Sequence, residues 1–570
     1  MELNLKQTEA MEHGSGPLLI AAGAGSGKTR TLTSRLLCLL RSGARPRQII
    51  AITFTNKAAG EMRERIMNQE PGITGLFIGT FHSLGAKILR ENARHLGRTA
   101  DFTIYDEDDS LRLLKKNAPK NCDFWQIKQE IRRAKNELLD KTEDRLANTV
   151  FKKYDTALRE NNVFDFDDLI EKTVRLFREQ PAVLQKCQNR WQQILVDEFQ
   201  DVNTAEYWLI KLLAEKHRNL SVVGDDFQSI FAFKGSDFRN FLNFEHDWPE
   251  AKLVLLEENY RSTANIIQAA NEVIKNNQCQ KKKNLWTKNI AGELIKAAAL
   301  PDEAAEASFI AAEVSRLPQK NIAILYRTNA QSRALEQALL QREIPYQIFG
   351  GLRFYDRKEI KDILAGLRVA VNPQDTVSAE RLQKTFFKRK SEGLINELPR
   401  LTAKLSILEL INHILQTTDY FEYLKRNYPN AEERTENIQE LIRFAANFDG
   451  DGGLAEFLEK TSLVSSLENP RSANDQPPVN LMTIHLAKGL EFDAVFVAGC
   501  NEGTLPHHRS YANSADIEEE RRLMYVAMTR AKNQLCLTFC HRPSRFLLEI
   551  PPQLLAWETA ETEEESWIEY

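Results

Sequence analysis

The chain of 570 residues has few of the features that mark secreted, membrane-spanning or metal-clustered proteins. Its seven cysteines are scattered and form no Cys-x-x-Cys pair, which argues against zinc fingers, iron–sulfur clusters and a disulfide framework. No apolar run approaches the roughly 20 residues that a membrane helix needs, and the N-terminus lacks a signal-peptide pattern. We therefore expect a protein of the reduced cytoplasm without a membrane partner.

A strong excess of charge is also absent, because the formal net charge is −4. Total charge does not exclude a nucleic-acid partner, since contacts to a phosphate backbone depend on the local placement of Lys and Arg. Basic clusters occur at residues 128–135, 281–283 and 388–390, and such clusters are typical of solvated faces. The length predicts about three or four domains in an ordinary globular protein.

The chain is organised around residues 18–29, Leu-Leu-Ile-Ala-Ala-Gly-Ala-Gly-Ser-Gly-Lys-Thr. An apolar run ends in a glycine-rich turn, whose backbone N–H groups can wrap a polyphosphate, and a helical pattern follows. Lys28 can reach the terminal phosphates, and Thr29 can ligate Mg²⁺. We predict a nucleoside triphosphate site whose phosphate loop consists of Ala22, Gly23, Ala24, Gly25, Ser26, Gly27, Lys28 and Thr29.

Two acidic residues, Asp197 and Glu198, follow the apolar residues 194–196. We expect Asp197 to hold Mg²⁺ and Glu198 to orient and deprotonate the attacking water. A hydrolysing enzyme needs this second carboxylate, whereas a kinase needs an acceptor pocket instead. An Asp-Glu pair is common, but its place after an apolar strand and before Phe-Gln-Asp favours nucleotide hydrolysis.

Short apolar strands alternate with helical patterns, which predicts parallel sheets whose ligands lie at the carboxyl ends of the strands. One set of strands is expected at residues 18–22, 49–54, 77–80, 194–196, 220–224 and 253–256, and a second at 322–327, 479–483, 495–498 and 534–538. A helical stretch without convincing strands interrupts the first set at about 84–188, and another interrupts the second set at about 375–477. The predicted fold class is therefore α/β, with two parallel-sheet cores that are each split by a mainly helical insertion.

Further motifs follow in order: Asp-Glu-Phe-Gln-Asp at 197–201, Gly-Asp-Asp-Phe-Gln-Ser-Ile at 224–230, Glu-Glu-Asn-Tyr-Arg-Ser at 257–262, Thr-Ile-His-Leu-Ala-Lys-Gly-Leu-Glu-Phe at 483–492 and Tyr-Val-Ala-Met-Thr-Arg-Ala at 525–531. From about residue 3 to 551 the chain resembles the UvrD/Rep/PcrA helicases of superfamily 1. The resemblance implies two RecA-like P-loop domains: 1A at 1–83 and 189–262, its insertion 1B at 84–188, 2A at 263–374 and 478–557, its insertion 2B at 375–477, and an acidic tail at 558–570.

The resemblance also assigns roles around ATP. It implies that Gln7 hydrogen-bonds the adenine, that Arg30 and Tyr260 stack on it, and that Glu491 contacts the ribose. Gln228 matches the residue that senses the γ-phosphate, and Arg261 and Arg530 match arginine fingers, which stabilise charge on the transferring phosphoryl group. With Lys28, Asp197 and Glu198 they form the implied catalytic set, which hydrolyses ATP with Mg²⁺ in a cleft between the two RecA-like domains.

Single-stranded DNA and its junctions with duplex are the implied partners. The matching positions are Phe54, Asn56, Thr80, His82, Phe166, Phe231, Phe233, Arg327, Asn329 and His507. The phenylalanines would stack on bases without regard to sequence. From the sequence alone, core packing explains any one of these phenylalanines at least as well.

The sequence departs from the family in three places. Phe231-Ala232-Phe233-Lys234 replaces the usual Tyr-x-Trp-Arg, and Lys does not reproduce a planar Arg, so weaker coupling between ATP and DNA is expected. The 2B insertion appears shortened, because no Gly-Ile-Gly signal follows Asn372-Pro373, and no long C-terminal extension is expected. The loop after residue 538 is compressed.

The principal hypothesis is an ATP-dependent helicase and single-stranded DNA translocase, with 3′→5′ polarity taken from the resemblance, acting in DNA repair, replication or recombination. An alternative, favoured by the shortened insertion, is a translocase that displaces proteins and unwinds weakly without a partner. A third hypothesis is a DNA-binding scaffold with a vestigial ATPase, against which the intact motifs argue. We expect a monomer or a weakly self-associating protein near the nucleoid, with repair or replication proteins as partners.

Overall fold

A computed structural model describes residues 2–119, 121–317, 321–350, 352, 354–386, 388–402, 404–448, 453–454, 456–458, 461 and 477–559. The chain divides into two compact units, Met1–Ile290 and Ala291–Tyr570. Each unit is built on a parallel sheet, which confirms the predicted α/β class with two sheets. The predicted domain boundaries stay predictions, and the part of the acidic tail beyond Thr559 lies outside the described residues.

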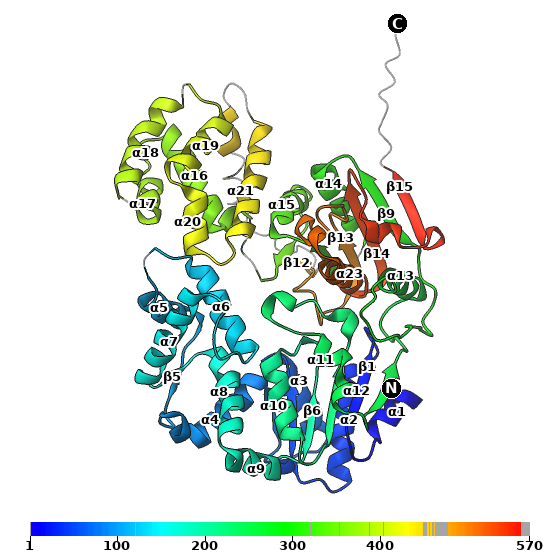
Figure 1. The fold of residues 1–570 in the computed structure, drawn as a ribbon. Coiled ribbons are helices and arrows are strands. Elements are labelled where there is room, and N and C mark those ends of the chain that lie inside the picture. Colours follow the sequence, from blue (N-terminus) through cyan, green and yellow to red (C-terminus); the bar gives the residue numbers. More distant parts are fainter. Residues whose placement is uncertain are drawn as a thin grey trace. The chain divides into compact units, whose positions relative to one another are not determined.

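The first unit contains a six-stranded parallel sheet of order β3-β2-β6-β7-β1-β8 (Figure 1). All carboxyl ends of these strands lie along one edge, so the segments that follow the strands gather there. The strands are β1 (Leu18–Ala22), β2 (Ile49–Thr53), β3 (Phe77–Thr80), β6 (Gln193–Val196), β7 (Leu220–Gly224) and β8 (Lys252–Leu256).

Helices cover both faces of this sheet. One face packs against α1 (Leu5–Met11), α2 (Lys28–Arg41) and α3 (Asn56–Gln69). The other face packs against α4 (Phe81–Asn92), α8 (Phe166–Glu179) and α10 (Thr204–Ala214). Since alternate side chains of a strand point to opposite faces, a strand covered on both faces is apolar throughout, as all five residues of β1 show.

The predicted helical insertion of the first unit contains α5 (Glu107–Asn117), α6 (Phe124–Asn136) and α7 (Arg145–Glu160), packed around a common apolar cluster. It also contains a parallel pair of two-residue strands, β4 (Thr103–Ile104) and β5 (Val163–Phe164). The expectation of no strands here was wrong, because two residues are too few to produce a period in the sequence. α9 (Pro181–Arg190), α11 (Arg239–Leu242), α12 (Phe244–Asp247) and α13 (Ala264–Ile274) complete the unit.

After α13 the chain runs along the first unit in a stretch that we call the return segment (residues 275–290). The carbonyl of Leu285 accepts a 2.7 Å hydrogen bond from Asn271 Nδ2, and Ile290 accepts a 3.0 Å bond from the N–H of Ala264. The side chain of Leu285 is buried over the phosphate loop, where a Cβ added to Gly23 would lie 1.9 Å from Leu285 Cδ2. The return segment is therefore part of the first unit.

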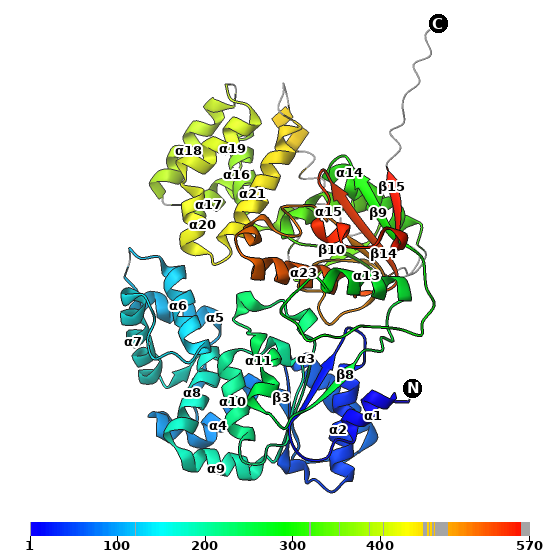
Figure 2. The same cartoon turned by 45° about the vertical axis from the view of Figure 1, so that its right-hand side comes forward.

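The second unit contains a seven-stranded parallel sheet of order β11-β12-β10-β13-β14-β9-β15 (Figure 2). α14 (Glu303–Ser315) and α15 (Ser332–Gln341) share its apolar core on one face, and α23 (Ser514–Met528) packs against β13 and β14. The strands are β9 (Ile295–Leu300), β10 (Ile322–Tyr326), β11 (Tyr346–Ile348), β12 (Val479–Thr483), β13 (Phe492–Val497), β14 (Ala531–Cys540) and β15 (Leu555–Thr559). The strands β9, β11 and β15 are absent from the sequence-based prediction.

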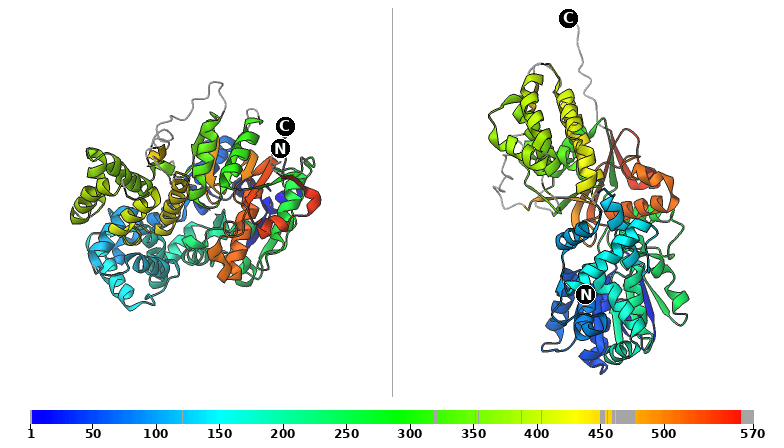
Figure 3. Two further views of the ribbon diagram at one scale, coloured as in Figure 1. Left: turned by 90° about the horizontal axis from the view of Figure 1, so that it is seen from above. Right: turned by 60° about the vertical axis from the view of Figure 1, so that its left-hand side comes forward.

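A bundle of helices forms a separate apolar core in the second unit (Figure 3, yellow-green to yellow). Its first helix begins at Lys358, before the predicted start of the insertion at 375. The helices are α16 (Lys358–Val371), α17 (Thr376–Thr385), α18 (Lys388–Leu401), α19 (Ile407–Thr417), α20 (Tyr420–Asn427) and α21 (Ala431–Ala446), and the short α24 (Arg545–Leu548) precedes β15. Among the described residues, no helix has the length and apolar character to cross a membrane.

Candidate functional site

The phosphate loop joins the carboxyl end of β1 to the first turn of α2. Gly25 and Gly27 have φ values of +64° and +80°, a left-handed backbone that other residues rarely adopt, so the turn requires glycine at both positions. Gly27 is the N-cap of α2, and the first N–H groups of the helix have no partner within the helix. The loop and the helix N-terminus together form a cradle suited to an anion.

Both predicted carboxylates meet this loop. Thr29 Oγ1 donates a 3.0 Å hydrogen bond to Asp197 Oδ2, and Lys28 Nζ lies 3.8 Å from Glu198 Oε1. The carboxylates follow β6, whereas the loop follows β1, and the parallel sheet brings both segments to one edge. The structure therefore assembles these four predicted residues in one place.

Thr29 and Asp197 also fit the predicted Mg²⁺. Burial, followed by the charge of Glu198, raises the pKa of Asp197 to about 7, as expected for a carboxylate that lacks sufficient positive charge around it. Hydroxyl and carboxylate oxygens suit Mg²⁺, which usually keeps several waters and substrate phosphates as its other ligands. In the described part of the chain, no group of three or more His, Cys, Asp or Glu side chains is arranged as a protein-only metal cage.

The three residues predicted to contact adenine lie in the first unit. Gln7 Nε2 donates a 2.9 Å hydrogen bond to the carbonyl of Ser26 in the phosphate loop. The N–H of Tyr260 donates a 3.0 Å bond to the carbonyl of Gly25. Arg30 is half-buried in the first turn of α2. Two of the three residues are thus tied to the loop itself.

Gln228 and Arg261 lie in turns that follow β7 and β8. Gln228 Nε2 donates a 2.6 Å hydrogen bond to Asp225 Oδ2, which fixes its side chain toward the end of β7. The backbone of Arg261 is held by Asn259, whose Oδ1 accepts from the Arg261 N–H over 2.9 Å. The side chain amide of Asn259 donates a 2.7 Å bond to the carbonyl of Ala24, so this turn is anchored to the phosphate loop.

Three of the predicted DNA-binding residues form a row of rings, which we call the aromatic row (Phe54, Phe231 and Phe233). The rings of Phe54 and Phe231 are stacked, with centroids 6.1 Å apart and an interplanar angle of 6°. Phe233 meets Phe231 edge-on at 6.0 Å and is 67% exposed, so it does not pack in the core. Such a row offers flat apolar faces to unstacked bases.

The remaining predicted DNA contacts of the first unit lie on neighbouring segments. Thr80 caps α4, and its hydroxyl accepts from the N–H of Ser83. The His82 ring meets Phe166 edge-on at 5.6 Å, and Phe166 is 51% exposed, which excludes core packing for this phenylalanine as well. Burial lowers the pKa of His82, which favours its neutral form. Asn56, the first residue of α3, is exposed.

In the second unit, the predicted site residues are paired with groups of the unit itself. Arg327 makes a two-pronged ion pair with Glu520, at 2.8 and 3.1 Å, and Asn329 donates to Glu433. Arg530 is buried and donates to the carbonyls of Val526 and Leu490 at 3.0 and 3.2 Å. Glu491 pairs with Lys532 at 3.0 Å.

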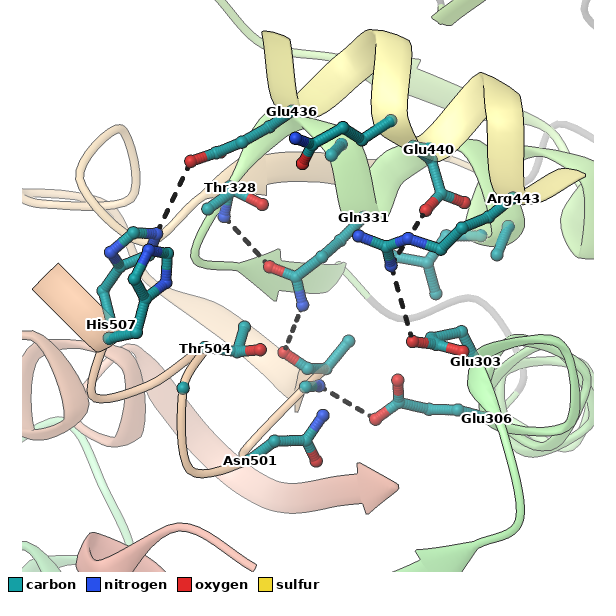
Figure 4. A pocket seen from close by; sticks show the side chains of 18 residues that line it. Glu303, Glu306, Thr328, Gln331, Glu436, Glu440, Arg443, Asn501, Thr504 and His507 are labelled. Carbon is teal, nitrogen blue, oxygen red and sulfur yellow. Dashed lines mark hydrogen bonds and ion pairs between the residues drawn. The ribbon is translucent and has the colours of Figure 1, made fainter. Parts of the chain in front are cut away.

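The last of these residues, His507, lines a cavity of about 200 Å³ at the carboxyl ends of β10 and β13 (Figure 4). His507 Nε2 lies 3.6 Å from Glu436 Oε1 on α21, as the figure shows. Gln331 spans another wall, because it accepts from the N–H of Thr328 and donates to the carbonyl of Ala498. We call the acidic residues of this helix the α21 glutamates (Glu432, Glu433, Glu436 and Glu440).

Several residues that hold the site together are absent from the sequence-based predictions. Gln200 and Asn259 lie inside recognised motifs, yet nothing in the motif shows that their side chains bridge separate segments. Lys283 was assigned to a solvated basic face, and for this residue that interpretation was wrong. Its side chain is fully buried and lies 2.8 Å from Asp225 Oδ1, with Asp226 as a second partner. Although burial opposes it, these two carboxylates raise the pKa of Lys283.

A second basic cluster departs from the same expectation. Lys135, in the 128–135 cluster, is 1% exposed and lies 2.6 Å from Asp165 and 2.8 Å from Asp168. Both carboxylates belong to the first turn of α8 or its cap, next to Phe166. A basic cluster in the sequence can therefore contain buried residues that pair with carboxylates inside the fold, and composition does not distinguish these from solvated ones.

Taken together, parallel sheets, a phosphate loop and two carboxylates beside that loop are the features of a P-loop nucleotide hydrolase. Two models of known protein families match the chain and identify its family within this class. The UvrD/REP helicase N-terminal domain matches residues 3–249, and the UvrD-like helicase C-terminal domain matches residues 254–432 and 419–542. The chain therefore belongs to the UvrD/REP helicase family, which confirms the resemblance and the predicted enzyme class.

Two PcrA helicases match over nearly the whole chain. The ATP-dependent DNA helicase PcrA of Bacillus subtilis (strain 168) is 41% identical over 636 aligned positions, covering 97% of this chain and 86% of the relative. PcrA of Staphylococcus aureus (strain MRSA252) is 39% identical, covering 97% of this chain and 87% of the relative. Because the first alignment is longer than this chain of 570 residues, the relative contains residues that this chain lacks.

Proposed function

We propose that the protein is a DNA helicase and single-stranded DNA translocase that moves 3′→5′ at the expense of ATP, in DNA repair, replication or recombination. The observation that carries the proposal is the content of one sheet edge in the first unit. There the phosphate loop meets Asp197 and Glu198, and the segments after β2 and β7 bear the aromatic row. The proposed nucleotide site and the proposed base-stacking surface both lie at the strand ends of this one sheet. This arrangement supports a motor in which ATP and DNA bind to the same sheet.

In the proposed reaction, the phosphate loop and Lys28 bind the triphosphate, and Thr29 and Asp197 hold Mg²⁺, which neutralises phosphate charge when it is bound. Glu198 orients a water molecule and takes its proton. Gln228 senses the γ-phosphate. Its hydrogen bond to Asp225 connects its side chain to the turn at the end of β7. Arg261 and Arg530 act as arginine fingers, whose planar donor forks suit the charge on the phosphoryl oxygens.

On the DNA side, we propose that the aromatic row and Phe166 stack on bases, while Thr80, His82, Arg327, Asn329 and His507 contact the sugar–phosphate backbone. The exposure of Phe233 and Phe166 supports this assignment, since both rings are available to a ligand. Stacking without hydrogen bonds to base edges would make binding tolerant of sequence. Single strands and their junctions with duplex are the proposed substrates.

The test is strand displacement with Mg·ATP on duplexes that carry a 3′ tail, a 5′ tail or no tail, together with hydrolysis on bare single strands. Unwinding that requires the 3′ tail is the expected result. Unwinding from the 5′ tail alone would contradict the proposed polarity. Hydrolysis that single-stranded DNA does not stimulate would contradict a translocase and favour a DNA-binding scaffold.

A second candidate is a translocase that strips proteins from DNA and unwinds poorly without a partner. The Bacillus relative contains residues that this chain lacks. The sequence predicts that the 2B insertion is the shortened part, and a reduced 2B insertion favours this second candidate. Strong hydrolysis and displacement of a DNA-bound protein, without strand separation from any tail, would select this candidate.

A further inference from the structure

A buried glutamine lies two residues after the proposed catalytic base. Gln200, in the 3-10 turn Phe199–Asp201, is fully buried, and the mechanism above gives it no role. Its Nε2 donates a 2.5 Å hydrogen bond to Glu198 Oε2 and a 3.2 Å bond to Asp201 Oδ2. Its Oε1 accepts a 2.9 Å bond from the N–H of Asp225, beyond the end of β7. One side chain thus joins the catalytic carboxylate to a neighbouring strand.

These partners fix which way the amide faces. A backbone N–H can only donate, so the Asp225 N–H requires the amide oxygen of Gln200. Ionised carboxylates can only accept, so Glu198 and Asp201 require the amide nitrogen. No rotation of the amide satisfies both sides in another way, and no other uncharged side chain of this length carries a donor and an acceptor on one planar group. The site therefore specifies glutamine by its chemistry.

The surrounding backbone leaves room for this side chain and for little else. A Cβ added to Gly224, the last residue of β7, would lie 2.5 Å from Gln200 Oε1 and 3.1 Å from the backbone nitrogen of Gln200. The first separation is shorter than real contacts allow, and the second is tighter than most; Phe241 Cε2, at 2.9 Å, closes the same space. The end of β7 is therefore packed closely against the Gln200 amide and the Phe241 ring.

The backbone of Glu198 adopts an uncommon conformation. Its φ and ψ values are +52° and +42°, a left-handed conformation that costs a non-glycine residue energy and persists where the surroundings hold it. The ion pair with Lys28 is long, at 3.8 Å, whereas the bond from Gln200 is 2.5 Å. Of these two contacts, the one from the buried amide is the closer.

We infer that Gln200 is a positioning residue for hydrolysis, which holds the Glu198 carboxylate toward the attacking water and ties it to the turn that carries Gln228. Asp225 makes this link on both sides, since its N–H binds Gln200 and its Oδ2 accepts from Gln228 Nε2 over 2.6 Å. A chain of buried hydrogen bonds thus runs from Glu198 through Gln200 and Asp225 to Gln228. The inference rests on the proposed role of Glu198 as the base.

The experiment measures ATP hydrolysis by the full chain on single-stranded DNA, with kcat and KM for ATP determined separately for Gln200→Met, Glu198→Gln and the double variant. Gln188→Met is the matched control. Gln188 is also buried in the first unit, and its Nε2 donates a 2.8 Å bond to the carbonyl of Leu212, away from the phosphate loop. Gln200→Asn, which keeps the amide but shortens its reach, serves as a second variant if Gln200→Met does not fold.

We expect Gln200→Met to lower kcat about 10- to 100-fold, as misplacing a catalytic group by about 1 Å does, while KM for ATP changes less than about threefold. Gln188→Met should retain kcat. Added to Glu198→Gln, the Gln200→Met change should cost nothing further, because residues that act through one group are not additive.

An unchanged kcat in Gln200→Met, an equal loss in Gln188→Met, or a full additional loss in the double variant would overturn the inference while leaving Glu198 as the base. If Glu198→Gln itself retains kcat, both the proposed base and the role of Gln200 are wrong. The two failures are therefore distinguished by one set of proteins.

Discussion

The two sheets of the protein present polar residues at the same kind of edge, yet their basic side chains lie at different distances from the neighbouring carboxylates. In the first unit, Lys28 and Thr29 meet Glu198 and Asp197, so predicted ligands of ATP contact one another. In the second unit, Arg327 is paired with Glu520, and His507 lies beside Glu436. At the first edge the ion pair of Lys28 is long, at 3.8 Å, whereas at the second edge Glu520 holds Arg327 through two bonds of 2.8 and 3.1 Å.

This difference has a physical meaning for the ligands. A phosphate entering the first unit finds a cradle whose backbone geometry is already set by Gly25 and Gly27. A phosphate approaching Arg327, Asn329 or His507 must compete with carboxylate oxygens, which offer the same acceptor chemistry. If the second unit binds DNA as proposed, binding exchanges one partner of these side chains for another, and its strength depends on how firmly the glutamates hold them.

The largest expected effect concerns the edge of the first sheet. Lys28→Ala removes the positive charge that faces both Glu198 and the terminal phosphates, so hydrolysis should fall about 10³-fold or more. Binding to single-stranded DNA, measured by fluorescence anisotropy, should stay close to that of the unchanged protein. A parallel loss of DNA binding would mean that the loop is needed for the DNA-binding surface to form.

The next effect tests the second unit. Arg530→Ala should lower DNA-stimulated kcat about 10³-fold, and Arg530→Lys should not restore it, because an ammonium lacks the planar fork of the guanidinium. Since Arg530 also binds the carbonyls of Val526 and Leu490, thermal unfolding of both variants has to be followed alongside. A normal kcat in a folded variant would leave Arg530 with a purely structural role.

A smaller change is expected at the aromatic row. Phe233→Ala removes an exposed ring, and base stacking is worth about 1–3 kcal/mol. The DNA concentration that half-stimulates hydrolysis should therefore rise about tenfold, while hydrolysis without DNA is unchanged. Equal stimulation of the two proteins would remove Phe233 from the DNA site.

The smallest expected effect concerns the α21 glutamates, which face basic groups of the second unit. Glu436→Gln removes a negative charge that faces His507 and Arg509, so affinity for single-stranded DNA should increase about threefold at low salt. Glu422→Gln is the matched control, because it removes the same charge from an exposed pair with Lys425 on α20. If both variants bind alike, the α21 glutamates do not compete with DNA.

The phosphate loop and the order of the motifs were accessible from the sequence because each depends on local chemistry. A few neighbouring residues are enough to recognise each feature: glycines between a strand and a helix indicate the phosphate loop, and carboxylates after an apolar strand indicate the Asp-Glu pair. By contrast, β9 reads Ile-Lys-Ala-Ala-Ala-Leu, which lacks β-branched residues after the first, and β11 has only three residues. Their strand conformation comes from pairing with neighbours along the sheet, which local patterns do not encode.

The supporting contacts of the site were inaccessible for a related reason. Lys283 pairs with Asp225 and Asp226 across more than fifty residues of chain, and Gln200 meets Asp225 across twenty-five. Neither pairing leaves a periodic or compositional trace. The resemblance to a family supplied the roles of Gln228 and Arg530, but it did not say what holds them.

The contact between Gly23 and Leu285 has a consequence for how the sequence can vary. Any side chain at position 23 would occupy the space of the Leu285 methyl groups, so a mutation there forces the Leu285 side chain to move. A smaller residue at position 285 would make room for it. We therefore expect positions 23 and 285 to vary together, and Leu285→Ala, 262 residues further along the chain, to suppress a defect of Gly23→Ala.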